Sequence, residues 1–514
     1  MSMLAYLLPL TLFAAAIVCF TGPGLRPRRS LAIVEGAALA VLAGAVIFGT
    51  MAATYGAAGS ALIGANGIGL QIRVDAVSAV MVLLVSFIGW VVIRYARTYM
   101  DGDARQGTFM GRLALTLGFV LLLVTSGNVG QLVLAWIGTS LSMHRLLLFY
   151  GDRPVARLAA GKKFLFARIG DVFLISAAVL LVQGFGTGEI AAMSAALDEG
   201  LVPQGTGWAA FCIAMAALLK SAQFPTHGWL TEVMDAPTPV SALLHAGVIN
   251  AGGFLVIRFS DIFLAAPGFA MALLAVVGGL TAALASLVML TQTAVKSALA
   301  WSTAAQMGFM LLQCGLGAFP AALLHIVAHS LYKAHAFLGS GSVVDLARAK
   351  LGHRLSPVRP RDAVLSLAVA LCAVGLTGWA FGVTLETKPA LVVLAAILVL
   401  GLAQLVALSM GQGARGPLVI RASLVSFGLS AVYFALQLGA ETLTAGTLPE
   451  TGSVGPMLQV VMGMILALFV ATAAVQILAP VRLAEGRWRP LVTHLRQGLY
   501  VTPVLNRLLA PKLA

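Results

Sequence analysis

Apolar runs about as long as a membrane-spanning helix recur along almost the whole chain. A helix needs ~20 apolar residues to cross the hydrocarbon core of a bilayer, and we count about fifteen such runs. They show no strict alternation of polarity, which argues against barrel strands, and a chain with 60% hydrophobic residues could not bury its apolar surface as a soluble domain. The sequence therefore predicts an all-α polytopic membrane protein with about 14–15 transmembrane helices. The runs begin near Met3, Leu31, Val74, Gly111, Asn128, Phe164, Trp208, Pro237, Gly268, Val295, Phe319, Ala363, Pro389, Leu418 and Met457.

Lysine and arginine gather in alternate predicted loops, which is typical of the cytoplasmic side of a membrane protein. Arg26, Arg28 and Arg29 follow the first run, whereas the intervening loops hold mainly acids such as Glu189 and Asp198. An odd number of spans then places the N-terminus outside and the C-terminus in the cytoplasm. Nucleic-acid binding is another explanation of the net charge of +14, but the charges follow loop parity and form no single patch.

One membrane domain is expected over residues 1–480, followed by a basic amphipathic cytoplasmic tail over residues 481–514. Residues 55–73 are interpreted as a small external hairpin and residues 188–199 as a short surface helix. The tail and the loop at 346–362 form the expected surface for a cytoplasmic partner. Apolar and aromatic residues in the tail have the spacing of an interfacial helix, namely Trp488, Leu491, Leu495, Leu499 and Tyr500.

Lys220 ends the apolar run that begins at Trp208, and Pro225 follows five residues later. A charge in hydrocarbon costs roughly 2.5–3.5 kcal/mol, and a proline frees backbone groups that need protein or water partners. The pair predicts a broken helix beside a cavity, although Lys220 could instead reach a membrane surface. His245 lies on the next apolar run, and His227 lies within the broken segment or just outside it.

His325, His329 and Lys333 are spaced four residues apart and fall close to one face of a helix. Imidazoles accept and donate protons near neutral pH, so the three side chains could form a proton relay. The alternative is that each polar group only bonds across helices as packing glue. His335 falls on nearly the opposite side.

The remaining candidates are weaker. Asp171 with Arg168 could be a local ion pair, and Lys296 at the start of a run is typical of a cytoplasmic flank. A second helix break is predicted at 378–382, near Glu386 and Lys388, in a faint internal repeat. The four cysteines are isolated, His325 and His329 have no acid or cysteine in register for a metal, and no enzyme motif is present.

Five ordered stretches resemble the antiporter-like family of respiratory complex I and Mrp-type antiporters, over roughly residues 75–345. They are Lys162–Asp171, Lys220–Trp229, Ala236–His245, Lys296–Phe309 and His329–Ser342. The resemblance implies two inverted five-helix repeats, about 111–258 and 268–412, each with a broken helix. It also implies a proton path of buried lysines and histidines, here Lys220, His245, Lys296, His325, His329 and Lys333.

This sequence departs from the family at two places. The family usually has Trp-Glu-Gly where this chain has Trp136-Ile137-Gly138, so the carboxylate that pairs with the broken-helix lysine is missing. His144 and Arg145 occur further along the same run. The second broken helix lacks its lysine in register. Possible accessory residues are therefore His144, Arg145, Asp171, His227, Glu386 and Lys388.

Two further stretches, Ser142–Pro154 and His494–Tyr500, resemble the DabB-type membrane subunits of inorganic carbon accumulation complexes of the bacterial inner membrane. That resemblance implies a cytoplasmic DabA-type partner, zinc-dependent and related to β-carbonic anhydrases. The expected activity couples a cation gradient, expected to be protons, to conversion of CO2 to bicarbonate. Zinc would belong to the partner, with no cofactor in this chain. The alternatives are a proton-pumping subunit of a complex I-like dehydrogenase or hydrogenase, and a subunit of an Mrp-type antiporter.

Overall fold

The computed structural model describes residues 2–233, 236–342, 360–411, 416–449, 455–482 and 489–513. Every predicted apolar run coincides with a helix, which confirms the all-α membrane fold. The N-terminal half contains α1 (Leu7–Thr21), α2 (Arg28–Tyr55), α3 (Ala76–Tyr99), α4 (Gln106–Val124), α5 (Val129–Leu147), α6 (Pro154–Phe185), α8 (Thr206–Lys220), α10 (Thr238–Ala246) and α11 (Ala251–Arg258). The C-terminal half contains α13 (Phe269–Met289), α14 (Val295–Gly315), α15 (Phe319–Leu338), α17 (Pro360–Ala380), α18 (Pro389–Gly411), α19 (Gly416–Thr444) and α20 (Pro456–Arg482).

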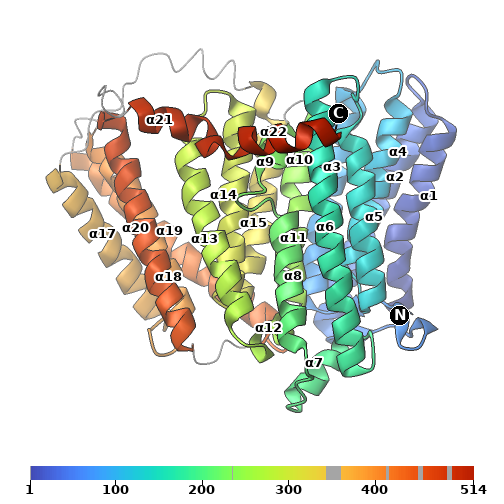
Figure 1. Ribbon diagram of the computed structural model, residues 1–514, viewed down its shortest axis with the longest axis horizontal. Helices are drawn as coiled ribbons and strands as arrows, with labels where there is room; N and C mark the ends of the chain where they lie inside the picture. The colour runs from blue at the N-terminus through green and yellow to red at the C-terminus, as the bar shows by residue number, and fades with distance from the viewer. Residues whose placement is uncertain are drawn as a thin grey trace.

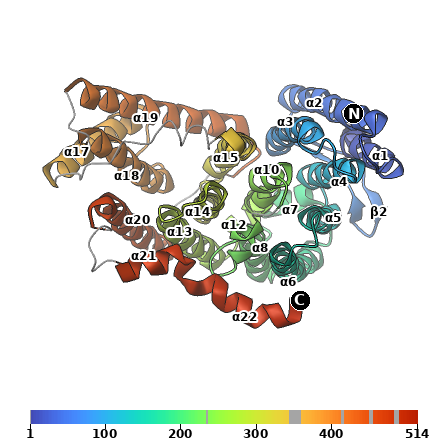
Figure 2. The ribbon, with the colours of Figure 1, turned by 90° about the horizontal axis from the view of Figure 1, so that it is seen from above.

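Within the described residues, 11 helical segments are long and apolar enough to cross a membrane, with α10 and α11 together forming one of them. The shorter apolar helix α8 and the helices α5, α14 and α15 stand among them in the same bundle (Figure 1, Figure 2). The N-terminus and the C-terminal helices lie at opposite ends of the bundle, as an odd number of crossings requires (Figure 1). Which end faces the cytoplasm stays a prediction.

Small elements complete the two ends of the bundle. The strands β1 (Ala58–Gly59), β2 (Ile63–Ala65), β3 (Ile68–Leu70) and β4 (Arg73–Val74) form two antiparallel pairs, which confirms the predicted hairpin. The predicted surface helix is α7 (Ile190–Asp198), and α12 (Ser260–Ala265) lies at the same end (Figure 1). The segment after α8 contains α9 (Gly228–Thr231).

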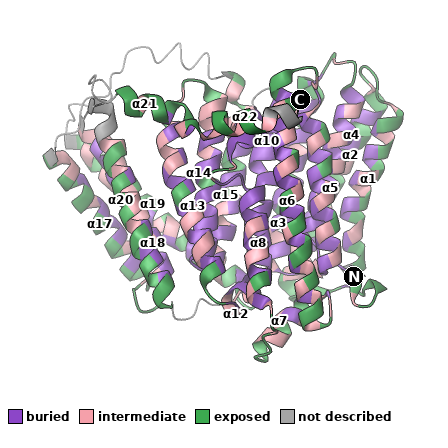
Figure 3. Ribbon diagram, in the orientation of Figure 1, coloured by how far each residue is buried: buried purple, intermediate pink, exposed green. Residues whose placement is uncertain are grey.

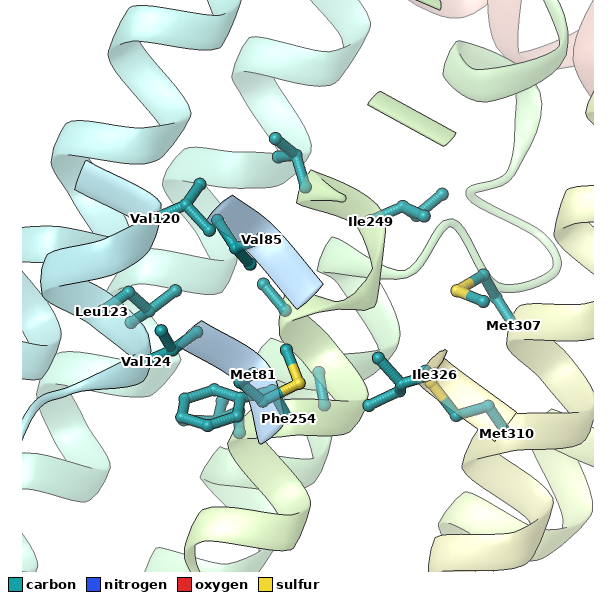
Figure 4. Close-up of a cluster of buried hydrophobic side chains, with 14 of the residues drawn as sticks. Met81, Val85, Val120, Leu123, Val124, Ile249, Phe254, Met307, Met310 and Ile326 are labelled. Carbon is teal, nitrogen blue, oxygen red and sulfur yellow. The ribbon is translucent and has the colours of Figure 1, made fainter. Parts of the chain in front are cut away.

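Small and apolar residues set the packing between helices. A Cβ on Gly308 of α14 would lie only 2.6 Å from the carbonyl oxygen of Gly278 on α13, so these two backbones meet closely. Apolar side chains from α3, α4, α11, α14 and α15 fill the centre, among them Met81, Phe254 and Ile326 (Figure 4). Buried residues concentrate in the middle of the bundle, whereas the outer helices α17 and α20 expose much of their surface (Figure 3).

The C-terminal tail lies across the helix ends as α21 (Arg489–Arg496) and α22 (Val501–Leu513) (Figure 1). The helix predicted from Trp488 to Tyr500 is present as α21, but it ends at Arg496, and the chain turns at Leu499 and Tyr500 into α22. Leu499 and Tyr500 have φ values of 56° and 60°, in the left-handed region that helices exclude. Trp488 and residues 346–359 of the predicted partner loop lie outside the described residues.

The second predicted helix break was also wrong. Helix α17 continues to Ala380, and Gly382, with φ of 69°, turns the chain into the loop that leads to α18. The glycines at 378–382 therefore end one helix rather than interrupt it. An interruption occurs instead at Gly247, whose φ of −126° and ψ of −76° separate α10 from α11. The repeat boundaries stay predictions.

Candidate ion path

Lys220 is the last residue of α8, where the helix ends and the chain turns towards α9. Its side chain is buried, and its Nζ lies 4.3 Å from the ring centroid of Trp136 on α5. No atom in the described parts of the chain accepts a hydrogen bond from this Nζ. The ring face therefore provides a cation–π contact at the position that precedes Ile137, where the family usually has its glutamate.

Helix α6 provides the charged groups nearest to this lysine. Asp171 forms an ion pair of 2.7 Å with Arg168, as the local interpretation predicted, and its carboxylate also attracts the charge of Lys220. Lys163 is buried as well, and its Nζ donates to the carbonyl oxygen of Ser140 at 2.6 Å. The charges of Lys163 and Lys220 repel one another. Two buried lysines, one arginine and one acid thus share this site.

Sequence reasoning did not identify Lys163 as a site residue. Helix α6 begins at Pro154, ten residues before the predicted start at Phe164, so Lys162 and Lys163, which precede the predicted run, lie within the helix. The eight-residue spacing of Lys163 and Asp171, which corresponds to about two helical turns, is the signal that was available.

His144, Arg145 and His227 have different surroundings. His144 is half-buried, with its ring 5.0 Å from that of Phe164, whereas Arg145 is exposed and lies outside the buried group. His227 is buried within the segment that follows the break. Its ring lies 5.1 Å from Phe224 and 4.9 Å from Trp301, centroid to centroid.

His325, His329 and Lys333 lie along one side of α15, as their spacing predicted. His325 Nδ1 lies 2.9 Å from Gln313 Oε1, and the rings of His325 and His329 are 6.0 Å apart. Lys333 is fully buried and donates to the carbonyl oxygen of Leu299 at 3.0 Å. His335 is exposed on the other side of the helix.

The interrupted helix α10–α11 joins this face directly. His329 Nε2 lies 3.1 Å from the carbonyl oxygen of His245, and because a carbonyl can only accept, that nitrogen is the protonated one. The ring of His245 stacks on Phe337 at 4.3 Å. Beyond the interruption, Asn250 Nδ2 donates to Ser330 Oγ at 2.7 Å. Gly247 and Asn250 were not identified from the sequence, because a single glycine in an apolar run is a weak signal of a break.

The other candidates lie apart from this group. Lys296 is half-buried in the first turn of α14, one turn before Leu299. Glu386 is exposed in the loop after α17, and Lys388 in that loop pairs with Glu441 at 2.5 Å. The described residues contain no group of three or more His, Cys, Asp or Glu side chains that could hold a metal ion. The expectation of no cofactor in this chain stays a prediction.

A buried ion cluster stabilises the end of α11 where the hairpin lies. Asp75, the N-cap of α3, pairs with Arg258 at 2.5 Å and with Arg73 at 2.6 Å. Burial alone would raise the pKa of the Asp75 carboxyl, but the two arginines outweigh it and hold that pKa well below its usual range. The cluster fixes the lower half of the interrupted helix against α3.

Two family models match the sequence. The model described as "NADH:quinone oxidoreductase/Mrp antiporter, TM" matches residues 126–413, and that described as "NADH-Ubiquinone oxidoreductase (complex I), chain 5 N-terminus" matches residues 63–110. Two solved structures share the fold. The Mrp complex from Dietzia sp. DQ12-45-1b aligns with a TM-score of 0.67 at 24% identity, over 99% of this chain and 59% of that one. An archaeal membrane-bound sulfane sulfur reductase aligns at 0.59 and 19%, over 98% of this chain and 97% of that one.

Three relatives illustrate the sequence similarity. The probable inorganic carbon transporter subunit DabB2 of Halothiobacillus neapolitanus is 42% identical over 88% of this chain and 82% of its own length. Subunit DabB of Hydrogenovibrio crunogenus is 46% identical over 56% of each chain. The NADH-quinone oxidoreductase subunit L of Escherichia coli is 36% identical over 55% of this chain and 46% of its own length. The chain therefore belongs to the membrane-subunit family of NADH:quinone oxidoreductases and Mrp antiporters, and within it to the DabB-type inorganic carbon transporter subunits.

Proposed function

We propose that this chain is the proton-conducting membrane subunit of a two-component inorganic carbon uptake complex. In this complex, proton flow through the chain drives conversion of CO2 to bicarbonate by a cytoplasmic zinc-dependent partner. The observation that supports this most directly is the series His325, His329 and Lys333 on α15. His325 is half-buried, His329 and Lys333 are buried, and His329 is bonded to the backbone of His245. Such groups are rare in membrane helices and mark ion pathways.

The series has the hydrogen-bonding capacity that a relay needs. The Nδ1 of His329 and the Nε2 of His325 are buried without a hydrogen-bond partner in the part of the chain that the structure describes. Buried polar atoms of this kind are normally satisfied by water, and the 6.0 Å between the two rings leaves a gap that a water molecule can bridge. Each of these two free nitrogens can take up a proton from the water and release it again, while the other nitrogen of each ring stays bonded to a carbonyl oxygen.

The second part of the path surrounds Lys220. Asp171, which is paired with Arg168, also attracts the charges of Lys163 and Lys220, and the two lysines repel one another, so a proton on one disfavours a proton on the other. Asp171 thus takes the part that the missing glutamate has in the family, and the Trp136 ring supports the charged form of Lys220. This arrangement can pass charge without the Trp-Glu-Gly motif.

The end of the bundle with α21 and α22 is the surface that we assign to the partner. Its exposed residues include Arg489, Arg496 and Arg507, which favour an acidic partner surface. When bound in that partner, zinc would activate water for attack on CO2. Proton flow through this chain would supply the driving force.

The test is rescue of a carbonic-anhydrase-deficient host growing in air, with this chain and its partner expressed together. Lys333→Ala should abolish rescue, and His335→Ala, which changes an exposed residue on the same helix, should leave it intact. Equal rescue by both variants would remove Lys333 from the mechanism. Purification of the tagged chain with quinone-reductase or hydrogenase subunits in place of a zinc protein would contradict the proposed complex.

A further inference from the structure

A hollow opens at the end of the bundle where α15 begins, between α15, α18 and α19. Its volume is about 290 Å³, and its lining includes Pro320, Lys388, Gln437 and Glu441. Lys388 Nζ donates to Glu441 Oε2 at 2.5 Å, and both side chains are partly exposed. The paired charges therefore stand at an opening, unlike the buried cluster around Asp75.

A larger cavity of about 620 Å³ lies further along α15, among α13, α14, α15, α18, α19 and α20. His325 and His329 line it, so the relay on α15 borders this space. Its other polar lining is mostly uncharged amide, from Gln306, Gln313, Gln404, Gln437 and Gln476. Amides donate and accept hydrogen bonds without adding a charge, which suits a chain of water molecules.

Gln437 connects the two spaces, because it lines both of them. Its Nε2 donates to Glu441 Oε1 at 3.1 Å, and its Oε1 is buried with no hydrogen-bond partner among the described residues. On the far side of the cavity, Gln313 contacts His325 at 2.9 Å. Polar groups thus stand at both ends of the cavity, Gln437 towards the surface and Gln313 beside the first histidine.

We propose that these two hollows form the entry route for the cation, with Glu441 and Lys388 at its mouth and Gln437 at its neck. This inference rests on the proposed function. A proton that binds the Glu441 carboxylate neutralises it and weakens its pairing with Lys388. The proton then passes through the cavity, along its five glutamines, to His325 and leaves the carboxylate free for the next one.

The dimensions of α15 support this assignment. A helix rises 1.5 Å per residue, so Pro320 at the mouth and Lys333 lie ~20 Å apart along the axis, about two-thirds of the hydrocarbon core. The route therefore extends from one surface of the bundle to a lysine near the other. If the Lys388–Glu441 pair served only to join the start of α18 to the end of α19, a route of this length would not be required.

The first test compares two glutamates by the rate of proton uptake into vesicles that contain the complex. Glu441→Gln removes the acid at the mouth, and Glu386→Gln makes the same change at an exposed residue two positions before Lys388. We expect Glu441→Gln to lower the initial rate of proton uptake into vesicles containing the complex on the order of a hundredfold, and Glu386→Gln to leave it unchanged. Equal rates in the two variants would overturn the proposed mouth.

The second test probes water access with a membrane-impermeant cationic thiol reagent. The reagent should block proton uptake by the Gln437→Cys variant. It should not block uptake by Leu438→Cys, because that residue is at the same depth but exposed on the outer surface of α19. Thr387→Cys, at the mouth, replaces Gln437→Cys if the latter does not assemble with the partner. Block at Leu438 alone, or at neither position of the route, would overturn the inference. Wild-type rates in Lys333→Ala would instead count against the proposed function itself.

Discussion

Asn506 of α22 donates through Nδ2 to Glu232 Oε1 over 2.8 Å, and its Oδ1 accepts from Lys162 over 2.6 Å. Lys162 also pairs with Glu232 itself. Glu232 follows α9 in the segment after the helix break, so the tail is bonded to the part of the chain next to Lys220. Gly498 of the tail also packs against Trp301, which contacts His227. The tail is thereby positioned to transmit partner docking to the broken helix.

Replacing Asn506 by Ala should loosen the tail without unfolding the bundle. A hydrogen bond to a charged group contributes about 1.5–3 kcal/mol, and two are lost here. We expect faster proteolysis near the kink at Leu499, measured on the purified complex. We also expect weaker rescue in air, measured in cells. Gln497→Ala, at an exposed tail residue, is the control. Equal proteolysis rates would show that these bonds do not hold the tail.

Asp171→Asn tests whether this acid serves in place of the missing glutamate. The change leaves Lys163 and Lys220 without a shared counter-charge, so proton uptake should fall on the order of a hundredfold. Asp171→Glu should retain most of the activity because it keeps the carboxylate. Asp198→Asn, at an exposed acid beyond α6, is the matched control. Uptake by Asp171→Asn equal to that of the control would exclude Asp171 from the path.

The buried cluster predicts a loss of stability with a defined pH dependence. Asp75→Asn leaves Arg258 buried with one partner fewer and should cost about 3–5 kcal/mol. The pKa of Asp75 is depressed in the folded chain, so its contribution is complete above its unfolded pKa of about 3.9 and is lost as pH falls towards the folded value. The difference in thermal unfolding between the two proteins should therefore be constant from about pH 5 to 8. A difference that changes across that range would contradict the assignment.

The helices and the face of α15 could be predicted because both depend on local sequence. Runs of apolar residues determine where membrane helices lie, and a four-residue spacing determines one face of a helix. The pairing of Lys162 with Glu232 and Asn506 depends on contacts 70 and 344 residues apart in sequence, which spacing alone does not reveal. For the same reason, two adjacent lysines at 162 and 163 resembled a loop flank.

Glycine-rich segments were the least predictable. The glycines at 378–382 and the single Gly247 give similar local signals, yet one set ends a helix and the other interrupts one. The difference comes from contacts with other helices. α17 and α18 pack against each other as separate helices, whereas Asn250, just before α11, is hydrogen-bonded to Ser330 of α15 next to the interruption. Likewise the partner of Lys388 is Glu441 on α19, 53 residues away, so the role of this lysine could not be inferred from its own segment.

The interruption at Gly247 should be sensitive to a single methyl group. A Cβ at this position would lie 2.8 Å from the carbonyl oxygen of Leu243, too close to fit without movement of the backbone. Gly247→Ala should therefore displace the carbonyl of His245, two residues earlier, from His329. We expect a destabilisation of about 1–3 kcal/mol and a loss of rescue larger than this destabilisation explains. In Gly428→Ala, where a Cβ meets no atom within 4 Å, stability should be unchanged or slightly higher. Rescue by Gly247→Ala at the level of Gly428→Ala would show that the His245–His329 contact is not needed for conduction.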